Sequence, residues 1–254
     1  MNETALTLIT INYNNLDGLR ATVASVQKQI TPKNNWKWIV IDGGSTDGSL
    51  PFLRERSDLF DYWVSEPDKG IYDAMNKGLQ QVEDGYVWFL NSGDRLHGEN
   101  AIGEVLRAIE AYPKMDCFYS DTYFVDEQYR ELGLISELKP QKFPEKLTFE
   151  SFRFGMNICH QSFIVRRQCA PNYKTEYRQA ADIDWILEIL KKRPACWQIK
   201  TVLSEFQTGG SSSQNSRKAM RERYQILKSH FGFLPNLWAH AWIVLRRFLS
   251  RGKY

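Results

Sequence analysis

The chain has 254 residues, of which 43% are hydrophobic, so it is large enough to form one sizeable domain, alone or with an extension. Its four cysteines include no C-x-x-C pair, which argues against a zinc site or redox pair and against a disulfide framework. The net charge of +3 is unevenly placed, because residues 217–254 carry nine basic residues and one acid, a charge of +8, which leaves −5 for residues 1–216.

Apolar strands and amphipathic helices alternate over the first 112 residues. The predicted strands are 6–14, 36–41, 62–65 and 86–90, and the predicted helices are 16–29, 49–56, 71–82 and 100–112. This alternation implies a mostly parallel sheet with helices on both faces. After Pro113 the pattern is irregular, with strands predicted at 117–125, 162–166 and 201–206 and a helix at 182–192.

A glycine- and serine-rich stretch at residues 209–216 leads to the basic tail. Apolar residues recur there at helical spacing, at Trp238, Trp242, Leu245 and Leu249. Cationic helices rich in aromatic residues lie in the membrane interface, although a helix docked on the body or on a second copy explains the same pattern. The start of the chain resembles no signal peptide and no run of about 18 apolar residues occurs, so we expect a cytoplasmic protein.

Three acidic clusters follow apolar runs in the first hundred residues. They are W-K-W-I-V-I-D-G-G-S-T-D-G at 36–48, S-E-P-D-K-G-I-Y-D-A-M-N-K-G at 65–78 and V-W-F-L-N-S-G-D at 87–94. Ligands bind at the carboxyl edge of parallel sheets, and carboxylates gathered there suggest a divalent cation with a hydroxyl-rich ligand. Taken singly, each cluster has a structural explanation: Asp94 and Asp42 also suit tight turns, and Asp68 suits a helix cap.

Together these clusters resemble the inverting family 2 glycosyltransferases, and most closely bacterial exopolysaccharide enzymes of the colanic acid type. Later segments are similar to further family motifs: C-H-Q-S-F at 159–163, A-A-D-I-D-W at 180–185 and S-E-F-Q-T-G-G-S-S at 204–212. The resemblance spans residues 6–213 and implies an α/β GT-A fold with a Rossmann-like sheet flanked by helices. It implies a domain at 1–213, with a nucleotide-sugar half at 1–112 and an acceptor and catalytic half at 113–213, followed by an amphipathic helical tail at 214–254.

The resemblance also implies which residues bind the donor, a GDP- or UDP-linked sugar. They are Asn12, Tyr13, Asn14, Asp42, Gly43, Asp68, Lys69, Asn76, Lys77, Asn91, Ser92, Gly93 and Asp94. Asp94 stands at the end of the family's D-x-D metal motif and is expected to hold Mn²⁺ or Mg²⁺. Asn91 and Ser92 replace the earlier acids of that motif, which leaves one carboxylate for the metal.

Asp182 matches the family's catalytic base, while Ala181 replaces the acid that often precedes it. The implied reaction is one in-line displacement, in which an acceptor hydroxyl attacks the anomeric carbon and Asp182 takes its proton. From the residues alone, a capped helix start explains Asp182 better, and it is the family resemblance that favours the catalytic role.

Four residues are candidates for the acceptor site: His160, Gln161, Tyr177 and Arg178. Packing explains His160 as well as binding does, and a surface strand explains the pair at 177–178. Gly209, Gly210 and Ser211 suit either a loop closing over the diphosphate or a plain linker.

The expected acceptor is a lipid-linked oligosaccharide at the inner face of the cell membrane, where the enzyme would sit peripherally. No nucleic-acid-binding motif is present, and self-association is possible. Two other functions remain open: a nucleotidyltransferase acting on sugars, and a non-catalytic sugar-binding protein at the membrane. The chain has neither the G-x-G-x-x-G of dehydrogenases nor a P-loop.

Overall fold

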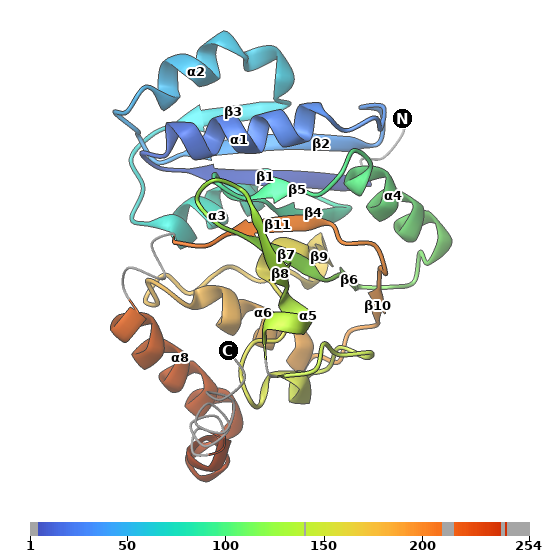
Figure 1. Cartoon of the computed structure of the whole chain (residues 1–254), viewed down its shortest axis with the longest axis vertical. Coiled ribbons are helices and arrows are strands. Elements are labelled where there is room, and N and C mark those ends of the chain that lie inside the picture. Colours follow the sequence, from blue (N-terminus) through green and yellow to red (C-terminus); the bar gives the residue numbers. More distant parts are fainter. Residues whose placement is uncertain (1–4, 140, 210–215, 240–241, 243–254) are drawn as a thin grey trace.

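The computed structural model describes residues 5–139, 141–209, 216–239 and 242, and its centre is a seven-stranded sheet (Figure 1). The strands of this sheet are β1 (Leu6–Asn12), β2 (Trp36–Asp42), β3 (Tyr62–Ser65), β4 (Tyr86–Phe89), β6 (Cys117–Tyr119), β9 (Phe163–Arg166) and β10 (Cys196–Gln198). Their spatial order is β10-β6-β9-β4-β1-β2-β3, and β9 alone runs against its neighbours. The predicted α/β fold with a mostly parallel sheet is confirmed.

A smaller sheet extends the molecule beside the end of β4. It contains β5 (Arg95–Leu96), β7 (Thr122–Val125), β8 (Glu131–Leu134) and β11 (Ser204–Gln207), in the order β5-β11-β7-β8. The strand predicted at 117–125 is therefore two strands in different sheets. The strand is interrupted at Ser120 and Asp121. Their side chains hydrogen-bond to neighbouring backbone groups, and this local pairing competes with the hydrogen bonds of a continuous strand.

Helices cover both faces of the main sheet. They are α1 (Leu16–Gln27), α2 (Ser49–Glu55), α3 (Ile71–Gln80), α4 (Ala101–Ala111) and α6 (Ala181–Lys191), with α8 (Ser216–Phe231) packed on α6. Helix α5 (Ile135–Leu138) contacts β7 and β8 of the smaller sheet, and residues 233–239 are also helical. Short 3₁₀ turns occur at Ser57–Leu59, Phe149–Phe152, His160–Ser162 and Arg167–Cys169.

Two hydrophobic cores result from the alternation of side chains along the buried strands. Successive residues of a strand point to opposite faces. Leu8 therefore joins the core formed with α1, α2 and α4, while Ile9 joins the core formed with α3, α6 and α8. Because β1 is buried along its whole length, its sequence is almost continuously apolar or β-branched.

The pairing register aligns polar residues at the carboxyl edge of the sheet. Asn12 at the end of β1 lies opposite Asp42 at the end of β2, and Asp42 lies opposite Ser65 at the end of β3. The loop after β4 carries Asp94 at the same edge, since β4 is parallel to β1. This register brings the three acidic clusters of the sequence towards one edge.

The first part of the predicted tail packs on the body of the protein. Helix α8 runs beside α6 and buries Ile226 and Leu227 in the core (Figure 1). Beyond it, Trp238 and Trp242 are 63% and 43% exposed, while Leu245 and Leu249 lie outside the described residues. Among the residues that are described, no helix has both the length and the apolarity needed to cross a membrane.

Candidate active site

A hydrogen-bond network surrounds the buried carboxylate of Asp42. Its Oδ1 accepts from Asn12 Nδ2 at 2.7 Å and from Ser45 Oγ at 2.5 Å. Its Oδ2 accepts from the Ser45 backbone N–H at 2.9 Å and from Ser65 Oγ at 2.6 Å. Four donors fill the usual capacity of a carboxylate, so Asp42 organises the ends of three strands. A direct contact between Asp42 and the nucleotide stays a prediction from the sequence.

Tyr13 is exposed and Asp68 partly exposed at this edge, and both lie close to the buried Gly43. The ring of Tyr13 is 63% exposed, and a Cβ on Gly43 would lie only 3.1 Å from it and would clash with Asp68 Oδ2. Asn14 accepts from the Thr46 backbone N–H at 2.8 Å, which holds the loop after β1 against the loop after β2. An exposed aromatic ring beside a partly exposed carboxylate suits a base and its hydroxyl-bearing sugar.

Asp94 lies in the loop between β4 and β5 and is 6% exposed. Its Oδ2 accepts from Gln161 Nε2 at 2.9 Å and its Oδ1 from the Gln207 backbone N–H at 3.2 Å. Burial raises the pKa of Asp94 to about 7, and these two hydrogen bonds oppose the rise. A buried carboxylate with so high a pKa gains most from a cation that would hold it in its charged form.

The same loop supplies neutral oxygens that fit a hard metal ion. Asn91 Oδ1 and Ser92 Oγ are buried without a hydrogen-bond partner within the described part of the chain. Mg²⁺ and Mn²⁺ prefer oxygen ligands and retain waters, so one carboxylate with amide and hydroxyl oxygens is a suitable donor set. Gly93 adopts a positive φ of 101°, and its N–H donates to Thr22 Oγ1, which fixes the turn before Asp94.

Helix α3 carries two further predicted donor residues, Asn76 and Lys77, which both bond to other parts of the protein. Asn76 exchanges two hydrogen bonds with the backbone of Tyr173, at 2.9 and 2.7 Å. Lys77 pairs with Glu66 at 2.7 Å, and Lys69 is exposed. Asn76 and Lys77 therefore join segments of the protein, and their approach to the sugar or phosphates stays a prediction.

Asp182 lies in the first turn of α6, facing Tyr72 of α3. The Tyr72 hydroxyl donates to Asp182 Oδ1 over 3.4 Å. Burial raises the pKa of Asp182, and the positive charge of Arg223, together with hydrogen bonds from the Ile183 backbone and from Tyr72, limits the rise. A carboxylate with a raised pKa is a stronger base, which suits proton abstraction from a hydroxyl.

Of the four acceptor candidates, two are buried and two lie at a surface pocket. His160 bonds Tyr173 Oη at 2.6 Å within an aromatic cluster, and burial lowers its pKa to about 3, so it is neutral and packed. Gln161 donates to Asp94. Tyr177 and Arg178 line a small pocket together with residues 69–73, and Arg178 Nη1 donates to the Lys69 carbonyl.

That pocket joins segments that are a hundred residues apart. Residues 69–73 belong to the second acidic cluster and include Tyr72, which contacts Asp182. The structure thus brings the second cluster next to the region of the predicted base. Sequence reasoning passed over Tyr72, although it lies inside the quoted 65–78 motif.

A family model described as "Glycosyl transferase family 2" matches residues 7–170, which is more than half of the chain. The chain belongs to glycosyl transferase family 2. Asp182 lies beyond the matched range, so its role is not carried by the family match.

Two curated relatives extend the similarity of this glycosyltransferase over nearly its whole length. It is 29% identical to an uncharacterised glycosyltransferase of Mycobacterium tuberculosis, Rv1514c, over 96% of this chain and 92% of that protein. It is 26% identical to TuaG of Bacillus subtilis, a putative teichuronic acid biosynthesis glycosyltransferase, over 89% of this chain and 90% of the relative.

Two solved structures share its fold. S. aureus TarS 1–349 in complex with UDP-GlcNAc superposes with a TM-score of 0.66 at 17% identity, over 89% of this chain and 67% of that one. The mannosyltransferase PcManGT of Pyrobaculum calidifontis, in complex with GDP-Man and Mn²⁺, gives a TM-score of 0.64 at 14% identity, over 99% and 76%. These likenesses establish the GT-A fold.

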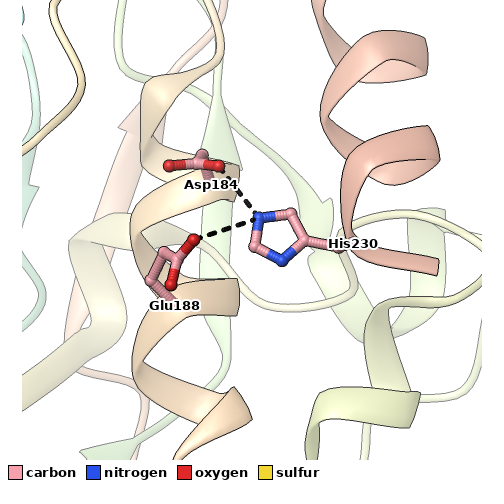
Figure 2. A group of neighbouring side chains, drawn as sticks. All are labelled: Asp184, Glu188 and His230. Atoms are coloured by element: carbon pink, nitrogen blue, oxygen red, sulfur yellow. Dashed lines mark hydrogen bonds and ion pairs between the residues drawn. The ribbon is translucent and has the colours of Figure 1, made fainter. Parts of the chain in front are cut away.

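A second acidic group lies on the other side of α6, and sequence reasoning missed it. His230 of α8 faces Asp184 and Glu188, with its Nε2 at 2.9 and 3.9 Å from their oxygens (Figure 2). The three ligand atoms lie within 4.8 Å of one another, which is compatible with a metal. Lys174 Nζ, however, already lies 3.1 Å from both carboxylates, so this amine supplies the positive charge.

In the glycosyltransferase this group joins α8 to α6. Burial opposes ionisation of Asp184, but hydrogen bonds from His230 and Lys174 outweigh it and leave the pKa of Asp184 below its ordinary value. An ionised carboxylate held by two nitrogen groups is a strong link between helices. Asp184, Glu188 and His230 are therefore explained as a link between helices without a metal.

Proposed function

We propose that the protein is an inverting glycosyltransferase that moves a sugar from a nucleotide diphosphate to a hydroxyl group of a glycan acceptor. The single observation that supports this best is the position of Asp182. It is a largely buried carboxylate with a raised pKa, and it contacts Tyr72 from the same segment that carries Asp68. A base beside a donor-binding segment suits direct attack by an acceptor hydroxyl.

The donor is proposed to lie along the carboxyl edge of the sheet, over Tyr13, Gly43 and Asp68. The UDP-GlcNAc and GDP-Man of the two solved structures belong to those proteins and do not fix the donor of this one. The exposed Tyr13 ring would support the base, and the partly exposed Asp68 would accept from its hydroxyl-bearing sugar.

Asp94, with Asn91 and Ser92, is the proposed site for Mn²⁺ or Mg²⁺. Such an ion would offset the charge that develops on the leaving diphosphate. The chain's own contribution is to hold Asp94 between Gln161 and the Gln207 backbone, so that its carboxylate has a fixed orientation.

The acceptor is proposed to be a lipid-linked oligosaccharide of exopolysaccharide, capsule or O-antigen synthesis, including colanic-acid-type pathways, reached from the inner face of the cell membrane. Support comes from an exposed apolar group beyond α8, formed by Phe233, Leu234, Leu237 and Trp238. Exposed basic residues of α8 accompany it, at Arg217, Lys218, Arg221 and Lys228. Apolar and basic residues together favour anionic lipid.

A donor screen tests the activity. The protein is incubated with UDP- and GDP-sugars, a hydroxyl acceptor extract and Mn²⁺, and the products are separated. Release of a nucleoside diphosphate with inverted linkage to the acceptor supports the proposal. Release of pyrophosphate identifies a nucleotidyltransferase instead, and turnover that survives thorough chelation rules out the metal role of Asp94.

Vesicle flotation tests the membrane assignment separately. We expect the wild-type protein to bind vesicles containing phosphatidylglycerol, and a Leu234→Ser, Trp238→Ala double variant to lose that binding. Trp197→Ala, which removes an exposed tryptophan from β10, serves as the matched control. Equal flotation of all three proteins contradicts the proposal.

A further inference from the structure

The only acidic residue between positions 217 and 254 points into the protein. Glu222 of α8 is 9% exposed, although it is surrounded in sequence by basic residues that face solvent. A carboxylate is rarely buried unless it is paired or hydrogen-bonded. Its partners therefore indicate what this part of the tail does.

Those partners are three consecutive backbone N–H groups just before α6. Glu222 Oε2 accepts from Gln179 at 2.7 Å and from Ala180 at 3.2 Å, and the Arg178 N–H lies 3.0 and 3.1 Å from the two oxygens. Ala180 is the N-cap of α6 and has no side chain that can cap the helix. Glu222 supplies the missing acceptor from another helix and places its charge at the favourable end of the α6 dipole.

Asp182 lies between two contacts of α6 with α8: it follows Ala180, which bonds to Glu222, by two residues and precedes Asp184, which bonds to His230, by two residues. His230 of α8 holds Asp184 at 2.9 Å on the far side of Asp182 (Figure 2). Glu222, Ile226 and His230 are spaced four residues apart, so they share one face of α8, and Ile226 is fully buried between the two polar contacts. The turn that carries Asp182 is thus held by α8 on both sides.

We infer that Glu222 is a positioning residue for sugar transfer: through the backbone N–H groups of residues 178–180 it fixes the turn on which Asp182 presents its carboxylate to the acceptor. The inference rests on the proposed function. It makes α8, which lies beyond the residues matched by the family model, part of the catalytic half of the molecule. The donor-binding edge should work without it.

The test compares Glu222→Gln and Glu222→Ala with Gln225→Ala, an exposed substitution on the same helix. We expect Glu222→Ala to lower kcat by about 10- to 100-fold, since small displacements of a catalytic group have effects of that size. Glu222→Gln keeps one acceptor oxygen and should recover part of the loss. The donor KM should change much less than kcat in all variants, because the proposed contacts of the donor with Tyr13 and Asp68 lie outside residues 178–180.

Hydrogen exchange followed by mass spectrometry tests the contact between Glu222 and the backbone of residues 178–180 without an activity assay. A peptide covering residues 175–187 should exchange faster in Glu222→Ala than in the wild type, while peptides of β1 and β2 stay protected in both. Protection in β1 and β2 also shows that the variant is folded. Unchanged exchange at 175–187 overturns the inference.

The kinetic outcomes separate this inference from the proposed function. An active wild type together with fully active Glu222→Gln and Glu222→Ala variants overturns only the positioning role. So does a variant in which kcat is unchanged and donor KM rises. A wild type that transfers no sugar from any donor, or whose transfer survives loss of the Asp182 carboxylate, overturns both.

Discussion

The two halves of the molecule hold their polar residues in different ways. In the proposed donor half, Asn12, Asp42 and Ser65 lie side by side because adjacent parallel strands end together, so the sheet register itself assembles the network. In the proposed catalytic half, Asp182 lies in the first turn of α6, a helix whose Trp185 packs against Phe89 of β4 and Phe163 of β9. On either side of Asp182, Ala180 and Asp184 hydrogen-bond to Glu222 and His230 of a helix some forty residues later in the chain. The donor half is built into the fold, whereas the catalytic half is assembled by tertiary contacts.

The largest effect is expected at Asp182, where a substitution should affect the chemical step and leave donor binding unchanged. We expect Asp182→Asn to lower kcat by about 10²- to 10⁴-fold, the range typical of a lost general base, because the amide cannot accept the acceptor proton. Donor affinity, measured by calorimetry with the nucleotide diphosphate, should be unchanged. Asp58→Asn, at an exposed aspartate, is the control. A variant with near wild-type turnover removes Asp182 from the mechanism.

A smaller effect is expected at the donor edge, where substitutions should alter KM and spare kcat. Asp68→Ala removes a proposed ligand, and Gly43→Ala displaces the same carboxylate, because the new Cβ would clash with Asp68 Oδ2. Each should raise the donor KM by about tenfold, as expected for one lost hydrogen bond to a charged group. Asp58→Ala is the control. If the two variants differ widely, Gly43 and Asp68 do not act on the same ligand.

Much of the donor half could be predicted from the sequence, for physical reasons. Buried parallel strands read as continuous apolar runs, and the polar residue that ends each run falls at the sheet edge. The same reasoning could not show that Asp42 has four internal donors or that Asn76 bonds to the backbone of Tyr173, since both depend on distant partners. The hydrophobic periodicity and the spacing of motifs in a sequence do not show which distant residues hydrogen-bond to one another.

The catalytic half was predictable only as a motif. The segment at 180–185 pointed to Asp182, but nothing in it indicated that Tyr72 would face that carboxylate or that Glu222 would cap the turn. One signal was available: a lone glutamate in a segment with nine basic residues. A charge opposite to all its neighbours is a reason to look for a buried partner.

Asp94 gives a third prediction, which concerns stability. Its pKa is about 7 in the folded protein against 3.8 ordinarily, so the folded state holds the proton more tightly. The stabilisation is complete below the ordinary pKa and is lost as pH rises towards 7, above which a buried charge remains. Asp94→Asn should therefore be more stable than the wild type at pH 8 in EDTA, and each 1 kcal/mol gained raises Tm by about 2–4 °C.

Adding Mn²⁺ should reverse that order. The cation stabilises the wild type by binding its folded state, and the Asp94→Asn variant should gain little. Differential scanning fluorimetry at pH 5 and pH 8, with and without the ion, gives all four values. A wild type that is more stable than the variant at pH 8 in EDTA argues that Asp94 is already paired with a positive charge.

The smallest expected effect lies at Tyr72, where the two halves meet. Its hydroxyl donates to the ionised Asp182 carboxylate and lowers the pKa of that group, so Tyr72→Phe should raise it. Because the base must be ionised to accept a proton, the acid limb of the pH profile should move to higher pH, with little change in kcat at its plateau. The profile is measured as kcat at saturating donor and Mn²⁺, since kcat reports groups in the bound complex and so excludes the titration of Asp94 in the free enzyme. Tyr62→Phe, at an exposed tyrosine of β3, should leave the limb where it is. A limb that moves to lower pH in Tyr72→Phe would mean that this hydroxyl stabilises the protonated acid, and the donor segment would then hinder the base it contacts.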